Sequence, residues 1–123
     1  MQGAAPQRNT QAECIGHCVR GQGGSSTITK EIGPGVALTR TGAGAYLLTW
    51  DENPGVFMGV LATLAAATPG NLAGHTVIFD TYDATTRTLP FVVYNASFAA
   101  HDLAANEYVH IEAKFARTSV LGA

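Results

Sequence analysis

The sequence predicts an all-β protein, a two-sheet antiparallel β-sandwich of jelly-roll-like type with about eight strands. The clearest evidence is the run 108–115, in which apolar and polar residues alternate with a period of two, as in a strand with one buried and one solvent-facing side. Short apolar runs bounded by turn residues recur upstream at intervals of roughly 8–12 residues, a spacing typical of sandwiches. In the closing strand the buried side is predicted to carry Val109, Ile111, Ala113 and Phe115, and the solvent side Tyr108, His110, Glu112 and Lys114.

The 123 residues are enough for one domain with its own hydrophobic core. We place a single β-sandwich domain at 13–123 and an extended N-terminal arm at 1–12. The arm is polar, contains Pro6 and has no large apolar residue except Met1, so it has too little to bury for folding alone. It is either a tail or a tether to a partner.

The first half of the domain alternates short apolar runs with glycine-rich turns. Residues 13–20 form a possible strand, 21–26 are predicted to be a turn, and 27–32 form the next strand. The runs 36–40 and 45–50 are separated by Thr41-Gly42-Ala43-Gly44, a link typical of a β-hairpin.

The apolar run from Val56 to Ala67 is compatible with a helix or a long strand. We favour a strand, because apolar positions alternate along it and Gly59 would weaken the interior of a helix. Thr68-Pro69-Gly70-Asn71 ends the run.

Two further strands are predicted at 75–82 and 88–94, joined by residues 83–87. Pro90 within the second of them indicates an edge strand or a bulge, because proline has no backbone N–H for the ladder. Residues 95–106 form a longer connection before the closing strand.

Composition limits the classes of partner. Charged residues make up 13% of the chain, against about 25% in an average soluble protein, and 46% of residues are hydrophobic, which suits a surface that packs against other proteins. The net charge is −2 and the seven basic residues are scattered, so we expect no nucleic-acid partner. The N-terminus has no signal-peptide pattern and no apolar run is long enough to span a bilayer, so we expect no membrane partner.

The sequence offers little for metal or redox chemistry. Cys14 and Cys18 flank His17, but in a strand residues four apart are separated by about 13 Å, too far for a disulfide, and no second ligand pair follows. We therefore expect reduced thiols, no metal site and no cofactor. The histidines are dispersed and are predicted to lie at the surface or at an interface; they are His17, His75, His101 and His110.

Motifs for catalysis are equally weak, and we expect no enzyme. The glycines at 21, 23 and 24 precede a β-prone segment rather than the helix that a phosphate-binding loop needs, and Ser25 and Ser26 lack a nucleophile-elbow motif. A carboxylate pair across a groove is conceivable among Asp51, Glu52, Asp80, Asp83 and Asp102. Aromatic residues could line a sugar-binding groove, although strand aromatics more often belong to cores or interfaces; they are Tyr46, Trp50, Tyr82, Phe91 and Tyr94.

Three segments between Gly35 and Val120 resemble small structural proteins of tailed bacteriophages: 36–49 (VALTRTGAGAYLLT), 102–107 (DLAANE) and 115–120 (FARTSV). The resemblance is to jelly-roll-type capsid cement, or decoration, proteins. It implies a protein made in the host cytoplasm that binds the outer surface of the virion capsid, clamps the major capsid protein and self-associates there as a homo-oligomer. The segment before Gly35 does not contribute to it.

For this role we expect partner contacts from the arm, which could add a strand to a neighbouring sheet, and from the predicted edge at Pro90. The residues assigned to the partner interface are Arg8, Asn9, Thr10, Gln11, Pro90 and Phe91. The alternative function is a phage fibre or lectin-like module that binds host glycans, and an enzyme ranks third.

Overall fold

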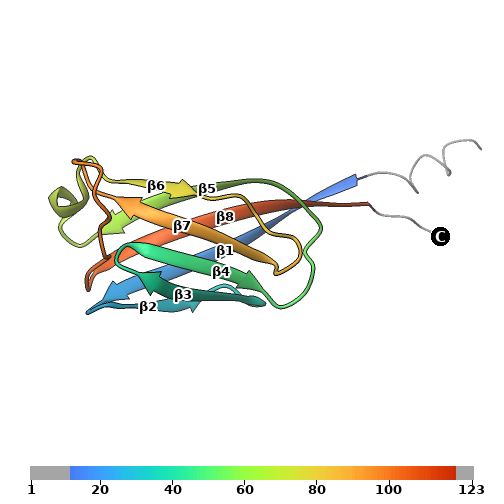
Figure 1. The fold of residues 1–123 in the computed structure, drawn as a ribbon, viewed down its shortest axis with the longest axis horizontal. Helices are drawn as coiled ribbons and strands as arrows, with labels where there is room; N and C mark the ends of the chain where they lie inside the picture. Colours follow the sequence, from blue (N-terminus) through green and yellow to red (C-terminus); the bar gives the residue numbers. More distant parts are fainter. Residues whose placement is uncertain (1–11, 119–123) are drawn as a thin grey trace, which may run out of the picture.

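The structure, a computed structural model, describes residues 12–118 and contains eight strands and one short 3-10 helix in that range. The strands form two four-stranded antiparallel sheets, in the orders β2-β1-β8-β5 and β3-β4-β7-β6 (Figure 1). The predicted two-sheet antiparallel sandwich with about eight strands is therefore confirmed. The elements are β1 (Ala12–Gly24), β2 (Thr27–Ile32), β3 (Val36–Gly42), β4 (Ala45–Trp50), β5 (Val56–Ala66), η1 (Pro69–Leu72), β6 (Thr76–Phe79), β7 (Thr88–Tyr94) and β8 (Glu107–Thr118).

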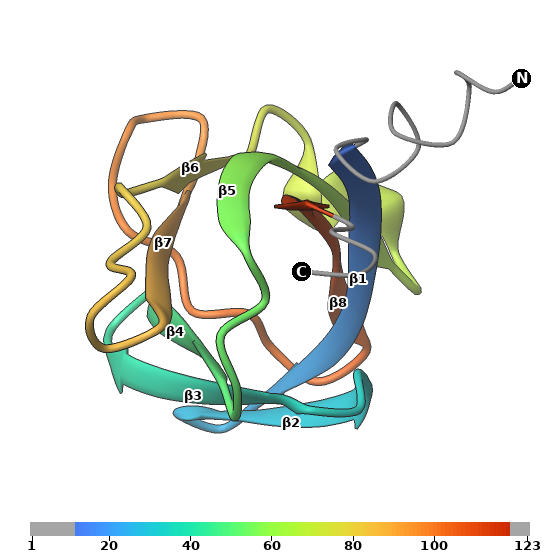
Figure 2. The ribbon, with the colours of Figure 1, turned by 90° about the vertical axis from the view of Figure 1, so that its right-hand side faces the viewer.

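Hairpins connect β1 to β2, β3 to β4 and β6 to β7, while the chain crosses between the sheets after β2, β4, β5 and β7. β2 lies against β3, and β5 lies against β6, so the two sheets approach each other along both sides. The end-on view shows how the two sheets curve toward each other around the core (Figure 2). Ala12 at the start of β1 pairs with Thr118 at the end of β8, so both strands reach the same end of the sandwich.

The core follows the alternation predicted for β8. Val109, Ile111, Ala113 and Phe115 are buried, while Lys114 is exposed on the opposite side of the strand. This confirms the facing of the closing strand. The other buried hydrophobic residues come from both sheets and from the β7–β8 connection: Val19, Val36, Leu38, Tyr46, Leu48, Trp50, Leu89, Phe91, Val93 and Leu103.

The β3–β4 hairpin is confirmed, with a tighter turn than predicted because β3 continues to Gly42. Gly44 has a φ of 68°, a conformation that favours glycine. A Cβ atom at Gly44 would lie 2.6 Å from the backbone nitrogen of His101, so the turn also needs glycine to let the β7–β8 connection pack against it.

β5 confirms that the run from Val56 is a strand rather than a helix. A bulge between Phe57 and Gly59 leaves Met58 as an extra, exposed residue. The predicted break after Ala67 contains the 3-10 helix η1. Among the described residues, no helix is long and apolar enough to cross a membrane.

The start of the domain differs from the prediction. β1 begins at Ala12, one residue inside the predicted arm, and continues to Gly24, so the turn is restricted to Ser25 and Ser26. The glycines that suggested a longer turn lie within the strand instead. Glycine is needed at position 23 because a Cβ atom there would collide with the carbonyl group of Leu103. These glycines allow close packing rather than chain reversal.

The prediction of an edge or bulge at Pro90 is wrong. β7 is an inner strand, and its register with β4 and β6 continues without a shift. The Pro90 carbonyl accepts a hydrogen bond (2.8 Å) from the Asp80 N–H, just beyond the end of β6 at Phe79. The N–H and C=O of one strand residue point to the same side, so an N–H at position 90 would also point toward Asp80. β6 has already ended there, and its ladder loses no hydrogen bond through the proline. β6 is accordingly shorter than the predicted strand 75–82.

Candidate functional site: the outer face of the β2-β1-β8-β5 sheet

The structure changes the set of residues predicted to contact a partner. Phe91 is 1% exposed and packs in the core against Tyr46 and Phe79, so its assignment to a partner surface is corrected. Pro90, its neighbour, is half-buried on the other side of β7. The predicted arm contacts Arg8, Asn9, Thr10 and Gln11 lie outside the described residues.

Most of the aromatic residues considered for a sugar groove belong to the interior. Tyr46 and Trp50 are buried, as Phe91 is, and only Tyr82 and Tyr94 are partly accessible. The Tyr46 hydroxyl accepts a hydrogen bond (2.9 Å) from the backbone N–H of Leu103, and burial raises the pKa of this tyrosine. The buried aromatics therefore belong to the core between the sheets, and Tyr46 also binds the β7–β8 connection.

His17 is not a surface residue as predicted, because it lies on the inner side of β1. Its ring packs edge-on against Phe115, with centroids 5.5 Å apart, and its Nδ1 accepts a hydrogen bond (3.3 Å) from the indole N–H of Trp50. Burial, together with the nearby Arg117, lowers the pKa of His17. A neutral imidazole suits this acceptor role.

Two histidines that are far apart in the sequence meet at the end of the sandwich that carries the β7–β8 connection. The rings of His75 and His101 are 4.5 Å apart, and His101 Nε2 lies 3.0 Å from the Glu107 carboxylate. Glu107 is 5% exposed and also accepts a hydrogen bond (2.8 Å) from the Ala104 N–H. The cluster fastens the connection, and no group of three or more His, Cys, Asp or Glu in the described range is arranged to hold a metal ion.

Three of the five carboxylates considered for a catalytic pair have structural partners. Asp102 accepts hydrogen bonds from Arg40 Nε (3.0 Å), Arg40 Nη2 (2.8 Å) and the Gly44 N–H (2.6 Å). The pKa of Asp102 is lowered, mainly by the hydrogen bonds from Arg40 and then by the hydrogen bond from Gly44. Asp80 and Asp83 each accept hydrogen bonds from backbone N–H groups in their own turns.

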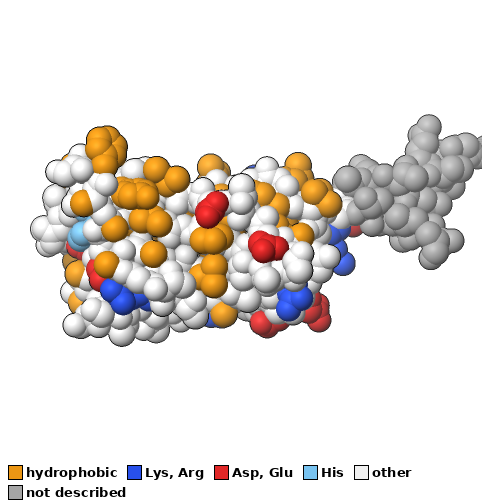
Figure 3. Space-filling model, in the orientation of Figure 1, with side chains coloured by type: hydrophobic (Ala, Val, Ile, Leu, Met, Phe, Trp, Pro, Cys, Tyr) orange, Lys and Arg blue, Asp and Glu red, His pale blue; other side chains and the backbone are white. Residues whose placement is uncertain are grey.

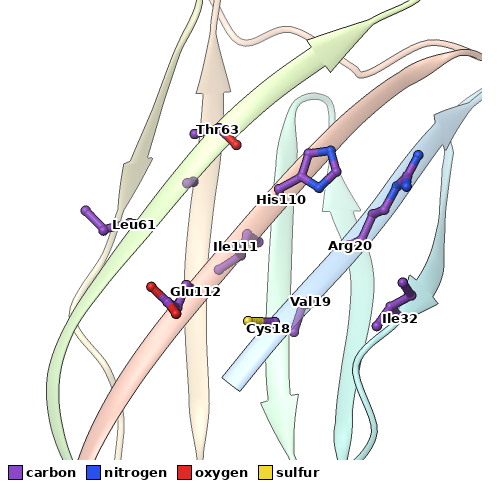
Figure 4. A pocket seen from close by; sticks show the side chains of 10 residues that line it. Cys18, Val19, Arg20, Ile32, Leu61, Thr63, His110, Ile111 and Glu112 are labelled. Carbon is purple, nitrogen blue, oxygen red and sulfur yellow. The ribbon is translucent and has the colours of Figure 1, made fainter. Parts of the chain in front are cut away.

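The surface with the clearest capacity for binding is the outer face of the β2-β1-β8-β5 sheet, here called the outer face. Its strand register aligns Cys18, Glu112 and Leu61 in one row across β1, β8 and β5. Arg20, His110 and Thr63 form the next row, and Ile32 of β2 extends it (Figure 4). These side chains surround a hollow of about 480 Å³.

The outer face also concentrates exposed apolar side chains. Among the described residues, six large hydrophobic side chains are exposed, and four belong to this sheet. They are Val56 (71% exposed), Leu61 (67%), Met58 (60%) and Ile32 (57%). Figure 3 shows the opposite side of the molecule, where the β3-β4-β7-β6 sheet lies in front and hydrophobic side chains also stand among uncharged ones. Exposed apolar groups gathered in one region indicate a protein-binding surface.

The charges on the outer face divide into paired and unpaired groups. Arg20 lies 3.0 Å from the Glu31 carboxylate and stacks over the Tyr108 ring at 4.5 Å. Glu112 and Lys114, by contrast, have no ion-pair partner within residues 12–118. Two charges of opposite sign, two residues apart on the central strand β8, are therefore free to meet a partner.

The two cysteines of the outer face are free thiols. Cys14 and Cys18 are both exposed, and both belong to β1, which includes the strand that the sequence predicted over 13–20. Gly16 lies between them, and its missing side chain leaves room for the Glu112 carboxylate: a Cβ atom there would be 3.3 Å from Glu112 Oε2.

No protein-family model, curated protein sequence or solved structure matches this chain. The function must therefore be inferred from the chain's own residues.

Proposed function

We propose that this protein is a structural virion protein that binds the outer surface of a phage capsid and stabilises the lattice of major capsid proteins. The observation that carries the proposal is the outer face, a hollowed sheet surface with exposed Val56, Met58 and Leu61 and few charges, which suits contact with another subunit of a lattice, a further copy of this chain included. Such a surface gains free energy when a protein covers it, at about 25 cal/mol per Å² of apolar area removed from water. A lattice repeats each contact many times, so modest contacts suffice.

The class of partner comes from the sequence resemblance to phage cement proteins. Two of the three segments that carry it have defined places in the fold: 36–49 covers the β3–β4 hairpin, and 102–107 covers the end of the β7–β8 connection. Leu103 from the second segment is buried beneath Tyr46 of the first. The resemblance thus concerns residues that build the framework, and the major capsid protein and further copies of this chain are the proposed partners.

The attachment to the capsid is assigned to the end of the sandwich at which β1 begins and β8 ends. The arm 1–11 precedes β1 at this end, and its proposed role is to add a strand to a neighbouring sheet through Arg8, Asn9, Thr10 and Gln11. The protein would act on the outside of the virion after synthesis in the host cytoplasm, without catalysis.

The glycan-binding alternative has weaker support. A lectin groove needs exposed aromatic rings beside polar groups, and three of the five aromatics considered for it are buried.

The test uses phage heads assembled without this protein. Adding the purified protein should raise the temperature at which the heads rupture, because a ligand that binds only the assembled lattice stabilises it by mass action. It should co-sediment with heads far better than it binds soluble major capsid subunits. Equal rupture temperatures with and without the protein, together with saturable binding to a bacterial polysaccharide, would reject the cement role and favour the lectin-like one.

A further inference from the structure

Two neighbouring rows of the outer face differ in the size of their side chains on β1 and β5 and in their charge on β8. The register places Gly16, Lys114 and Gly59 in one row across β1, β8 and β5, and Cys18, Glu112 and Leu61 in the adjacent row. On β5 the exposed Leu61 stands beside Gly59, above which a side chain would meet only open space. On β8 a carboxylate stands beside an ammonium group.

We propose that the outer face pairs with the same face of a second copy of this chain. The two-fold axis would lie between the two faces, across the strands, and midway between the two rows. With this axis, each strand faces the same strand of the second copy. The row that contains Lys114 faces the partner's row that contains Glu112. Lys114 then faces the partner's Glu112, and Glu112 faces the partner's Lys114.

The same operation matches the shapes of the two faces. Leu61 of each subunit comes to lie over the open space above the partner's Gly59. One row further out, the small Ala116 faces the partner's His110. A large group therefore meets a small one on β5 and again in the outer row of β8, which suits close packing of two sheets.

Charge favours a second copy over other occupants. The face presents one unpaired negative and one unpaired positive group on the same strand, so a uniformly acidic or basic partner would be attracted by one and repelled by the other. Only a surface with the same two charges in reversed order matches both, and the two-fold related copy is such a surface. The polar arm 1–11 offers one basic residue, Arg8, and no acidic one.

The inference deepens the proposed function, because it names the partner of the same face, but it does not depend on capsid attachment. It leaves the arm-bearing end of each subunit at the edge of the pair. A dimer that forms in solution and fails to bind heads would leave the inference standing and reject the cement role.

The test is analytical ultracentrifugation of the full chain, starting with the wild type and two charge reversals. The wild type should sediment as a dimer. Glu112→Lys and Lys114→Glu should each weaken dimerisation roughly ten-fold or more, because each places two like-charged pairs across the interface. Glu52→Lys, a reversal of an exposed charge outside this face, should leave the dimer intact.

The decisive experiment mixes the two weakened variants. One variant carries two positive charges on β8 and the other carries two negative charges, so the mixture should form a heterodimer in which both pairs attract. The double variant that exchanges the two charges should dimerise like the wild type. Leu61→Gln should weaken the dimer without lowering the melting temperature of the monomer, since Leu61 is exposed in the single chain.

Three results would overturn the inference: a wild type that stays monomeric up to millimolar concentration, a dimer that is insensitive to both reversals, or two variants that do not associate when mixed. A dimer that dissociates on removal of residues 1–11 and tolerates both reversals would point to exchange of the arm instead.

Discussion

His17 is predicted to make folding stability depend on pH. The indole N–H of the buried Trp50 donates to Nδ1 of His17, and this nitrogen accepts only while it carries no proton. The pKa of His17 is lowered in the folded protein, first by burial and then by Arg117. Protonation therefore opposes folding, because it removes the acceptor and places a charge in a partly buried site.

The direction of the effect follows from proton linkage. Histidine in the unfolded chain titrates near its ordinary pKa of 6.5, whereas His17 in the folded protein titrates lower. Between these two values the unfolded chain binds more protons, so the free energy of unfolding falls as the pH decreases. The contribution of His17 is constant above about pH 6.5 and is lost as the pH falls from there through the folded pKa.

The magnitude is set by the Trp50 N–H. His17→Ala leaves this buried donor without an acceptor, which should cost about 1–3 kcal/mol near pH 8. His17→Gln is the matched control, because its amide oxygen can still accept the hydrogen bond but cannot titrate. It should retain most of the stability near pH 8 and show a smaller loss near pH 5.5 than the wild type shows.

Urea unfolding followed by tryptophan fluorescence measures this directly, since Trp50 is the only tryptophan in the chain. The reasoning would be refuted if His17→Ala were as stable as the wild type near pH 8. It would also be refuted if His17→Gln lost as much stability on acidification as the wild type, because the titrating group would then lie elsewhere.

Three further predictions concern the core, the β7–β8 connection and the arm. Ile111→Asp should unfold the domain by burying an unpaired charge, whereas Lys114→Glu should hardly change the melting temperature of the monomer; similar losses would mean that β8 faces the other way. Asp102→Asn should lower the free energy of unfolding at neutral pH by weakening the pairing with Arg40. Because the folded pKa of Asp102 is lowered, the wild type should lose this contribution in urea titrations as the pH falls below about 3.8, and the variant should not. Deleting Met1–Gln11 should leave the melting temperature nearly unchanged but reduce co-sedimentation with cement-free heads, and undiminished attachment would reject the tether.

The elements that sequence patterns predicted well are those whose signals are local. The hairpin of β3 and β4 has Gly44 inside its turn, and the alternation along β8 reports directly on which side is buried. β5 was predicted as a strand for the same reason. In each case the period of the side chains and the turn chemistry are properties of neighbouring residues.

Predictions failed where a residue's role depends on distant parts of the chain. Gly23 indicates a turn by its type, but its small size is needed for the approach of the Leu103 backbone. Pro90 indicates an edge strand, yet β7 is internal and the shorter β6 removes the need for the missing N–H. His17 is polar, but it lies on the inner side because Trp50 supplies a buried donor for it.

The outer face shows the same limit for the candidate site. The alternation along β8 predicted that Glu112 and Lys114 face solvent, and it could not show that Leu61 and Gly59 lie beside them. That juxtaposition depends on the pairing of β5 with β8 and on the bulge at Met58, which shifts the register by one residue. Strand register is set by tertiary packing and is not visible in the single sequence.

Pairing through the outer face would also account for its mixture of apolar side chains and a few charged ones. A charged outer face would keep the chain monomeric, and a uniformly apolar one would promote unspecific association. Glu112 and Lys114 instead add a requirement for alignment to an otherwise apolar surface, because they attract in one register and repel when the copies slip by one row. On a capsid, a pair aligned in this way would present two arm-bearing ends at a fixed separation. The second attachment would then be intramolecular, so affinity for the lattice would rise without any new kind of contact.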